Sequence, residues 1–436
     1  MEQRIIAHSD LNCYYASVEM LRNPRLRDVP MAVCGRREER HGIVLTANYH
    51  AKRMGVKTGM ANWEAKQACP GMYTVAPHYG DYIQMSGFVR DIYKTYTDRI
   101  EPFGIDEAWL DFTGCVPTFK AGEAAICQIR ERIKRELGIT VSIGLSDNKI
   151  FSKLGSDMNK PDACTVIPRD RYKELVWPLP VGELLYVGRA TERKLRYKII
   201  YTIGDLANTD PDNLRRWFGK VGLVLHAFAN GEDRSMVAPA DFESPVKSVG
   251  NSFTCPRDLC CDNDARIMIY ALSESVGCRL MEQGLYASAV ELSFLNKDLS
   301  QFWTKRCRLP VPTNISGELA VAAIRLFRKA YGHWPSPLRK IGVRGCDLIS
   351  DASPRQITVF EDAAKMVKRE ELERTINILR SRYGNKVIQR AVMYTDSLLS
   401  GVDAKKDNVI HPVGVFTGGV SVSWGGYTTS IAAPSP

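Results

Sequence analysis

Two adjacent carboxylates, Asp106 and Glu107, interrupt an otherwise apolar segment of this chain, and a third, Asp10, ends its N-terminal apolar run. Burying a charged carboxylate is costly unless a cation balances it, and neighbouring carboxylates also repel each other. If the two segments are adjacent strands, the three carboxylates converge on one spot. Such a spot suits two Mg²⁺ ions, because hard cations prefer oxygen ligands and often share them with phosphates.

The plain alternative for this acidic pair is an exposed turn, where acidic residues are common. The apolar neighbours Ile105 and Trp109 favour burial instead. Adjacent side chains of a regular strand point to opposite faces. Asp106 and Glu107 therefore need a bulge or the start of a hairpin at Gly104 to reach one site.

The elements that must position these carboxylates alternate between strand and helix. Strands are expected near residues 1–10, 100–105, 108–113 and 141–145, and helices over 80–98 and 120–137. This order resembles a split βαβ layout, with residues 13–78 inserted after the first strand.

The following region, 169–236, has helical patterning. Its segments 187–195 and 203–207 fit a helix-hairpin-helix, in which backbone N–H groups at a helix N-terminus hold a phosphate. An ordinary pair of packed helices is the alternative. A linker over 237–246 then leads to a second small α/β domain. Its expected order is strand–helix–strand–strand–helix–strand, with strands near 247–254, 286–296, 304–310 and 338–346 and a helix over 316–330. A charged helix is expected beyond this domain, over 369–383.

Composition limits the class of protein. The chain has 436 residues, enough for about three domains of roughly 150 residues each. With 44% hydrophobic and 25% charged residues it resembles a soluble globular protein, and no apolar run is long enough for a membrane span. A strand begins too early to leave room for a signal peptide, so we expect a cytoplasmic protein without a membrane partner.

The cysteine content and the charge also limit the class of protein. The twelve cysteines are scattered and form no C-x-x-C pair, which favours free thiols in a reducing compartment over zinc or disulfides. The net charge is +10, and residues 245–350 hold 14 Lys or Arg against 9 Asp or Glu. A basic surface of this kind favours a polyanionic partner.

Six ordered motifs give the sequence a specific resemblance. They are SDLNCYYASVE (9–19), TANYHAKRMGVKTGM (46–60), FGIDEAWLDFTG (103–114), SIGLSDNKIFSKLGSDMNKPD (142–162), KSVGNSFTC (247–255) and LRKIGVRGCDL (338–348). Together these motifs resemble those of the Y-family translesion DNA polymerases, over about four-fifths of the chain. The resemblance implies an α+β, multidomain, right-hand polymerase with a ferredoxin-like palm, small fingers, a helix-hairpin-helix thumb and an α/β little finger.

The resemblance also implies domain limits. They are 1–12 and 79–168 for the palm, 13–78 for the fingers, 169–236 for the thumb, 237–246 for the linker, 247–350 for the little finger and 351–436 for a C-terminal extension.

By this resemblance Asp10, Asp106 and Glu107 are the catalytic metal ligands, and Leu11 supplies a backbone carbonyl. The implied reaction is attack of a primer 3′-hydroxyl on the α-phosphate of a deoxynucleoside triphosphate. One ion would lower the pKa of the hydroxyl, and the other would neutralise charge on the leaving pyrophosphate.

Nucleotide-binding residues are implied in the same way. Tyr15 occupies the steric-gate position, where its ring excludes a ribose 2′-hydroxyl, and Tyr14 is its packing neighbour. Plain helix packing is the alternative for both tyrosines. Tyr49, Lys52 and Lys160 fall at triphosphate-contact positions. Many family members carry Arg where Lys52 stands, so the adjacent Arg53 is a candidate to share this contact.

The DNA-binding candidates are Gly188 in the helix-hairpin-helix and, in the little finger, Lys247, Ser248, Arg339, Lys340 and Arg344. Backbone N–H groups and cations on strands would follow phosphates rather than bases. Binding of a primer–template should then be independent of sequence and sensitive to salt.

A short motif follows the little finger. Gln356, Ile357, Val359 and Phe360 resemble the Gln-x-x-Leu-Phe peptide by which bacterial polymerases dock on the sliding clamp, with Val in place of Leu. About 76 residues follow the motif, an arrangement that resembles a branch found in Gram-positive bacteria and their mobile elements.

The sequence is therefore identified as a member of the Y family, a low-fidelity polymerase that copies past damaged bases, and we expect a monomer. A two-metal nuclease with a helix-hairpin-helix is one alternative, although it would have no use for Tyr15 or Lys160. A non-catalytic clamp-binding repair scaffold is the other, although it would not need three intact carboxylates.

Overall fold

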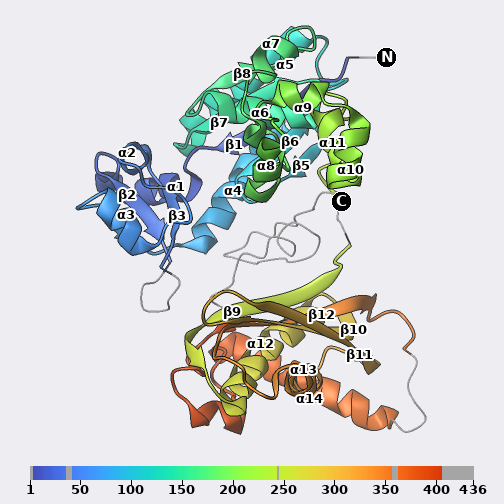
Figure 1. Cartoon of the computed structure of the whole chain (residues 1–436). Coiled ribbons are helices and arrows are strands. Elements are labelled where there is room, and N and C mark those ends of the chain that lie inside the picture. Colours follow the sequence, from blue (N-terminus) through green and yellow to red (C-terminus); the bar gives the residue numbers. More distant parts are fainter. Residues whose placement is uncertain (1–2, 36–41, 243–244, 356–361, 405–436) are drawn as a thin grey trace. The chain divides into compact units, whose positions relative to one another are not determined.

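The computed structural model describes residues 3–35, 42–242, 245–355 and 362–404 of the chain. These residues form two compact units that divide between residues 242 and 245 (Figure 1). Within these ranges, no helix combines the length and the apolar character needed to cross a bilayer.

A five-stranded sheet with the order β5-β6-β1-β7-β8 organises the first unit. Its strands are β1 (Ile6–Leu11), β5 (Ile100–Pro102), β6 (Glu107–Asp111), β7 (Val141–Ser146) and β8 (Cys164–Val166). The helices packed with it are α4 (Tyr79–Lys94), α5 (Phe119–Leu137) and α6 (Lys149–Met158). Both β1 and β7 are buried along their whole length, as expected for central strands with apolar sequences.

The predicted strands and helices of this sheet are confirmed, with small shifts at their ends. The strand expected over 100–105 stops at Pro102, because Gly104 turns the chain at a φ of 100° toward β6. Helix α5 begins where the Thr118 hydroxyl accepts a hydrogen bond from the Ala121 N–H, and it ends at Gly138, with a φ of 69°.

The segment inserted after β1 forms a three-stranded sheet with the order β3-β2-β4. Its elements are α1 (Tyr14–Arg22), β2 (Met31–Cys34), β3 (Val44–Ala47), α2 (Tyr49–Arg53), α3 (Asn62–Ala68) and β4 (Tyr73–Val75). The buried Asn48 side chain fixes the start of α2, because its oxygen accepts from the N–H groups of Ala51 and Met31.

Five short helices complete the first unit. They are α7 (Tyr172–Val176), α8 (Arg189–Tyr197), α9 (Ile203–Asn208), α10 (Pro211–Phe218) and α11 (Lys220–Ala229). Leu195, Ile203 and Leu225 belong to their shared core. The helical segments predicted at 187–195 and 203–207 are confirmed as α8 and α9.

The linker predicted over 237–246 is only partly a free connection. Val237 is buried against Ile6 and Trp109, and the Ala238 N–H donates to Glu101 Oε2 at 3.0 Å. The prediction missed this docking because the apolar contact surface lies on β1 and β6, far away in the sequence.

The second unit is a four-stranded antiparallel sheet with the order β11-β10-β12-β9, and its helices lie on one side of it (Figure 1). Its elements are β9 (Ser248–Leu259), α12 (Asp262–Glu282), β10 (Leu285–Asn296), β11 (Phe302–Thr313), α13 (Ser316–Tyr331) and β12 (Leu338–Ser350). The predicted order, strand–helix–strand–strand–helix–strand, is confirmed.

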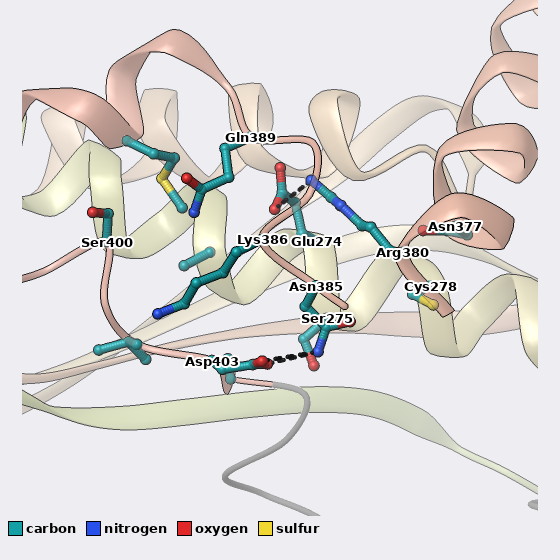
Figure 2. Close-up of a pocket in the computed structure, with 14 residues that line it drawn as sticks. Glu274, Ser275, Cys278, Asn377, Arg380, Asn385, Lys386, Gln389, Ser400 and Asp403 are labelled. Carbon is teal, nitrogen blue, oxygen red and sulfur yellow. Dashed lines mark hydrogen bonds and ion pairs between the residues drawn. The ribbon is translucent and has the colours of Figure 1, made fainter. Parts of the chain in front are cut away.

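Residues beyond β12 pack on the helices of this second unit. Helix α14 (Ala363–Tyr383) confirms the charged helix predicted over 369–383. Figure 2 shows Glu274 of α12 facing Arg380 of α14, at 3.0 Å, and Arg390 lies 3.2 Å from the same carboxylate. The cavity in Figure 2 measures about 50 Å³, room for only a few waters, so we interpret it as a packing seam rather than a ligand site.

Candidate active site

The pairing of β1 with β6 brings two of the predicted carboxylates together. The strands are antiparallel, and Asp10 is the direct partner of Glu107 in their register. Leu11 extends this pairing, because its N–H donates to the Asp106 carbonyl at 3.0 Å. Asp10 is only 6% exposed, so its carboxylate needs a compensating charge.

A hairpin turn places the third carboxylate, Asp106, next to Glu107 at the start of β6. Asp106 lies in the connection between β5 and β6, one residue before β6 begins at Glu107. It follows Gly104, whose positive φ starts the turn. This is the hairpin start that the sequence required for both acids to reach one site. Asp111, the last residue of β6, accepts a hydrogen bond from the Thr113 N–H and is structural.

Two lysines balance these acids. Lys153 Nζ lies 2.9 Å from Glu107 Oε2 and 3.2 Å from Asp10 Oδ2, and Lys160 Nζ lies 2.7 Å from Asp10 Oδ2. Asp157 contacts both ammonium groups, at 3.2 and 2.8 Å. Lys153 and Asp157 are one turn apart on α6, so this helix supplies a second charged layer over β1.

The pKa shifts follow from this crowding. Burial, and then repulsion by Glu107 and Asp10, raises the pKa of Asp106 to about 7. Burial and Glu107 also raise the pKa of Asp10. Burial opposes the charge on Lys153, but Glu107 and Asp10 outweigh it and raise the pKa of that lysine. The site therefore holds more negative charge than its own residues neutralise.

The buried His8 lies next to Glu107. Its Nδ1 lies 2.9 Å from Ser156 Oγ, and its Nε2 lies 3.3 Å from Glu107 Oε2. Burial, and then the charge of Lys153, lower the pKa of His8 well below its ordinary value, so the imidazole is neutral. Sequence analysis missed Lys153, Asp157 and His8, although the i, i+4 spacing on α6 was a readable signal.

The donor set fits a divalent cation. It consists of carboxylate oxygens, the ligands that Mg²⁺ prefers, and no basic side chain in the described ranges pairs with the Asp106 carboxylate. No three His, Cys, Asp or Glu side chains among the described residues already stand at the spacing of a metal site. The pairing of β1 with β6 brings the backbone positions together, but Lys153 contacts Asp10 and Glu107, and Lys160 contacts Asp10. A metal site of three converged carboxylates therefore stays a prediction.

Tyr15 lies in an aromatic cluster close to these acids. Its ring stacks on Tyr82 at 4.3 Å between centroids and meets the edge of Tyr79 at 6.1 Å. Burial, and then the charge of Asp106, raise the pKa of Tyr15, which places its hydroxyl within the field of that carboxylate. Tyr14 donates its hydroxyl to the Tyr82 carbonyl and is a buried packing residue.

The structure only partly assembles the predicted triphosphate contacts. Burial raises the pKa of Tyr49, with smaller effects from Cys13 and Asp10, so Tyr49 borders the site. Lys52 Nζ instead lies 5.1 Å from the centroid of the Tyr49 ring, and Arg53 Nη2 lies 3.1 Å from His50 Nδ1. Lys160 contacts Asp10 itself.

Known proteins share both the sequence and this fold. The impB/mucB/samB family model matches residues 9–157, and the model of that family's C-terminal domain matches residues 246–359. DNA polymerase IV of Acetivibrio thermocellus is 47% identical over 400 residues, 92% of this chain and 100% of the relative. DNA polymerase IV 1 of Bacillus subtilis is 35% identical, over 93% and 97% of the two chains.

A solved structure, a Y-family DNA polymerase chimera of Dbh and Dpo4, aligns with a TM-score of 0.71 and 25% identity, over 79% of this chain and 99% of the chimera. The chain belongs to the Y family of DNA polymerases. The predicted family, its Gram-positive relatives and the multidomain α+β fold are confirmed. The nuclease and scaffold alternatives are set aside, since the matched relatives are DNA polymerases.

In this Y-family polymerase, three of the predicted DNA contacts of the second unit, Ser248, Lys340 and Arg344, share one sheet face. Lys340 pairs with Leu295 of β10, and Arg344 pairs with Glu291. Leu295 and Glu291 alternate along β10 with the buried Leu292 and Phe294, so the face that they share with the two cations points away from the helices. Ser248 pairs with Cys346 on this same face, and Lys247 precedes it. Arg339 lies where the register shifts.

A row of small side chains crosses this face. Ser252, Gly342 and Ser293 are direct neighbours on β9, β12 and β10. A Cβ on Gly342 would lie 2.7 Å from Ser293 Oγ and 2.8 Å from Ser252 Cβ, so only glycine fits. This row lets a polymer backbone approach between Lys340 and Arg344.

Two further predictions have different outcomes. Gly188 is the exposed residue that precedes α8, with open space around its Cα, as a phosphate contact would need. The clamp-binding residues Gln356, Ile357, Val359 and Phe360 lie outside the described residues.

Proposed function

We propose that this polymerase copies damaged templates at the adjoining ends of β1 and β6, where Asp10, Asp106 and Glu107 lie, with two Mg²⁺ ions as cofactors. The observation that carries the proposal is the register of β1 and β6, which pairs Asp10 with Glu107 beside Asp106. When bound there, the ions would stabilise negative charge on the attacking hydroxyl and on the leaving phosphates.

The chain's own residues prepare this site. Lys153 Nζ lies 2.9 Å from Glu107 Oε2 and supplies a positive charge beside this carboxylate, and the neutral His8 ring borders the same oxygen at 3.3 Å. We propose that Lys160 leaves Asp10 for the nucleotide triphosphate, since an ammonium group suits phosphate as well as carboxylate. The loop of Lys160 is already anchored, because Asn12 Oδ1 accepts from the Asp162 N–H at 2.8 Å.

Sugar selection belongs to Tyr15 in this proposal. Stacking on Tyr82 holds the Tyr15 ring in a fixed position. Tyr82 is itself fixed, because its hydroxyl donates a hydrogen bond to Glu19 at 2.5 Å. A rigid ring of this kind can exclude a 2′-hydroxyl by contact alone. Tyr49 would contact the triphosphate, while Lys52 and Arg53 would first have to leave their present partners.

We assign the primer–template to the basic face of the four-stranded sheet and to the loop at Gly188. Lys340, Arg344 and the small-residue row support this assignment, because they offer cations and close backbone approach without base-specific groups. The sliding clamp as partner rests on the sequence motif alone. We also propose a monomeric, cytoplasmic enzyme, a location supported by its twelve free cysteines.

Primer extension across a template with one abasic site tests the proposal. The wild-type chain should lengthen the primer beyond the lesion, and added clamp should increase the length of the products. The double variant Gln356→Ala/Phe360→Ala should keep clamp-free synthesis and lose the stimulation. Arrest at the lesion under all conditions would contradict translesion synthesis, and loss of clamp-free synthesis in the double variant would contradict the clamp assignment.

A further inference from the structure

A basic, aromatic groove lies on the helical part of the first unit, away from the carboxylates. It is lined by Arg193, Lys194, Tyr197, Lys198, Trp217 and Phe218, from α8 and α10 and the turn after α8. Its volume is about 440 Å³, within the range of roughly 300–1,000 Å³ typical of sites for small molecules. Neither the carboxylate site nor the loop at Gly188 includes any of these residues.

The aromatic side chains of the groove are unusually open. Tyr197 is 84% exposed and Trp217 is 37% exposed, although burying such rings is normally favourable. Lys198 Nζ lies over both rings, 5.6 Å from the Tyr197 centroid and 4.9 Å from the Trp217 centroid. The cation and the two rings thus form one continuous surface.

The charge of the groove has one sign. Three of its six lining residues are cations and none is acidic. The wider stretch from 189 to 220 contains eight Lys or Arg against four Asp or Glu.

We propose that this groove binds a nucleotide of single-stranded nucleic acid outside the catalytic site. A flat base would stack on Tyr197 and Trp217, and its phosphates would lie near Arg193, Lys194 and Lys198. Aromatic platforms flanked by cations, without base-reading groups, are the usual means of binding unpaired strands. An acidic peptide would match the charge but would not need two open rings.

The groove can be tested in the full chain with a photoreactive strand. A 12-nucleotide oligothymidine carrying 5-iodouracil is irradiated with the protein while unlabelled primer–template is present in saturating excess. The peptide that contains Tyr197 or Trp217 should be cross-linked. Tyr197→Ala should lower the yield by about fivefold or more, the loss expected for one stacked base.

Tyr383→Ala is the matched control, because Tyr383 is similarly exposed, at 69%, but lies on α14. It should leave the cross-link unchanged, and Tyr197→Ala should leave primer extension on a one-nucleotide overhang unchanged. Cross-links only outside the groove, or equal yields from wild type and Tyr197→Ala, would overturn the proposal. So would complete competition by a polyglutamate peptide, which would indicate a protein partner instead.

Discussion

Individual charges explain how three carboxylates remain close together in a folded chain. Lys153 and Lys160 stand between acids that would otherwise repel each other, and Asp157 holds the two ammonium groups in place. The carboxylates were readable from sequence because acidic residues inside apolar strands are conspicuous. Lys153 was not, because a lysine on a helix usually points into solvent and only the packing of α6 shows otherwise.

Lys153→Met should destabilise the metal-free protein by about 3 kcal/mol, because Asp10 and Glu107 lose a partly buried counter-ion. The same change should strengthen Mn²⁺ binding, since no ammonium group then competes for the carboxylates. Urea unfolding and calorimetric titration measure the two effects. Lys134→Met is the control, because its ion pair with Asp162 is exposed and should contribute little. Equal effects of both variants would contradict the counter-ion role.

Tyr15→Ala should admit ribonucleotides, lowering sugar discrimination by about 100-fold while deoxynucleotide incorporation changes little. The reason is the loss of the ring that Tyr82 holds at 4.3 Å. Single-nucleotide incorporation with matched ribo- and deoxynucleotides measures it. Tyr14→Phe, which removes only a buried hydroxyl, should keep wild-type discrimination. Unchanged discrimination in Tyr15→Ala would remove the gate assignment.

At the scale of elements, α6 and β7 are the pair on which the site depends. Helix α6 carries Lys153 and Asp157 over β1, and it can do so only because Gly144 of β7 has no side chain. The strand β7 was predicted over 141–145 because the strand period is local, whereas the helix α6 was not predicted. The close crossing was not predictable either, since a glycine inside an apolar strand does not reveal which helix approaches it.

Gly144→Ala should destabilise the first unit by about 3 kcal/mol. Its Cβ would lie 2.1 Å from the Ser152 carbonyl oxygen and 2.4 Å from the Ser156 nitrogen, so α6 would have to move. Thermal unfolding measures the loss, and nucleotide incorporation should fall with it. Gly114→Ala is the control for a glycine with open space around it, although its positive φ predicts a smaller loss of its own. An unchanged melting temperature in Gly144→Ala would contradict the packing argument.

In the whole molecule, the acidic centre belongs to the first unit and the basic sheet face belongs to the second. The sequence motifs predict both, because the residue types that bind metal ions and phosphates are fixed by chemistry. They could not show that residues 362–404 pack on α12, since the Glu274 contacts with Arg380 and Arg390 join segments about a hundred residues apart. A charged helix read alone resembles a solvated one.

The double variant Lys340→Ala/Arg344→Ala should weaken primer–template binding and lower the slope of log affinity against log salt by about 2. Fluorescence anisotropy at several salt concentrations measures this slope. Lys305→Ala is the matched control: Lys305 is the cross-strand partner of the buried Leu292 and therefore points to the opposite face. If Lys305→Ala changed this slope as much as the double variant does, the assignment of the DNA face would be contradicted.

Single-turnover incorporation by Asp106→Asn, measured together with primer–template affinity, tests whether Asp10, Asp106 and Glu107 form the catalytic centre. The amide keeps the shape of Asp106 and removes its charge. We expect a rate lower by at least about 1,000-fold with DNA affinity unchanged, while Asp91→Asn, an exposed change on α4, keeps the wild-type rate. A wild-type rate in Asp106→Asn would show that these carboxylates are not the catalytic centre.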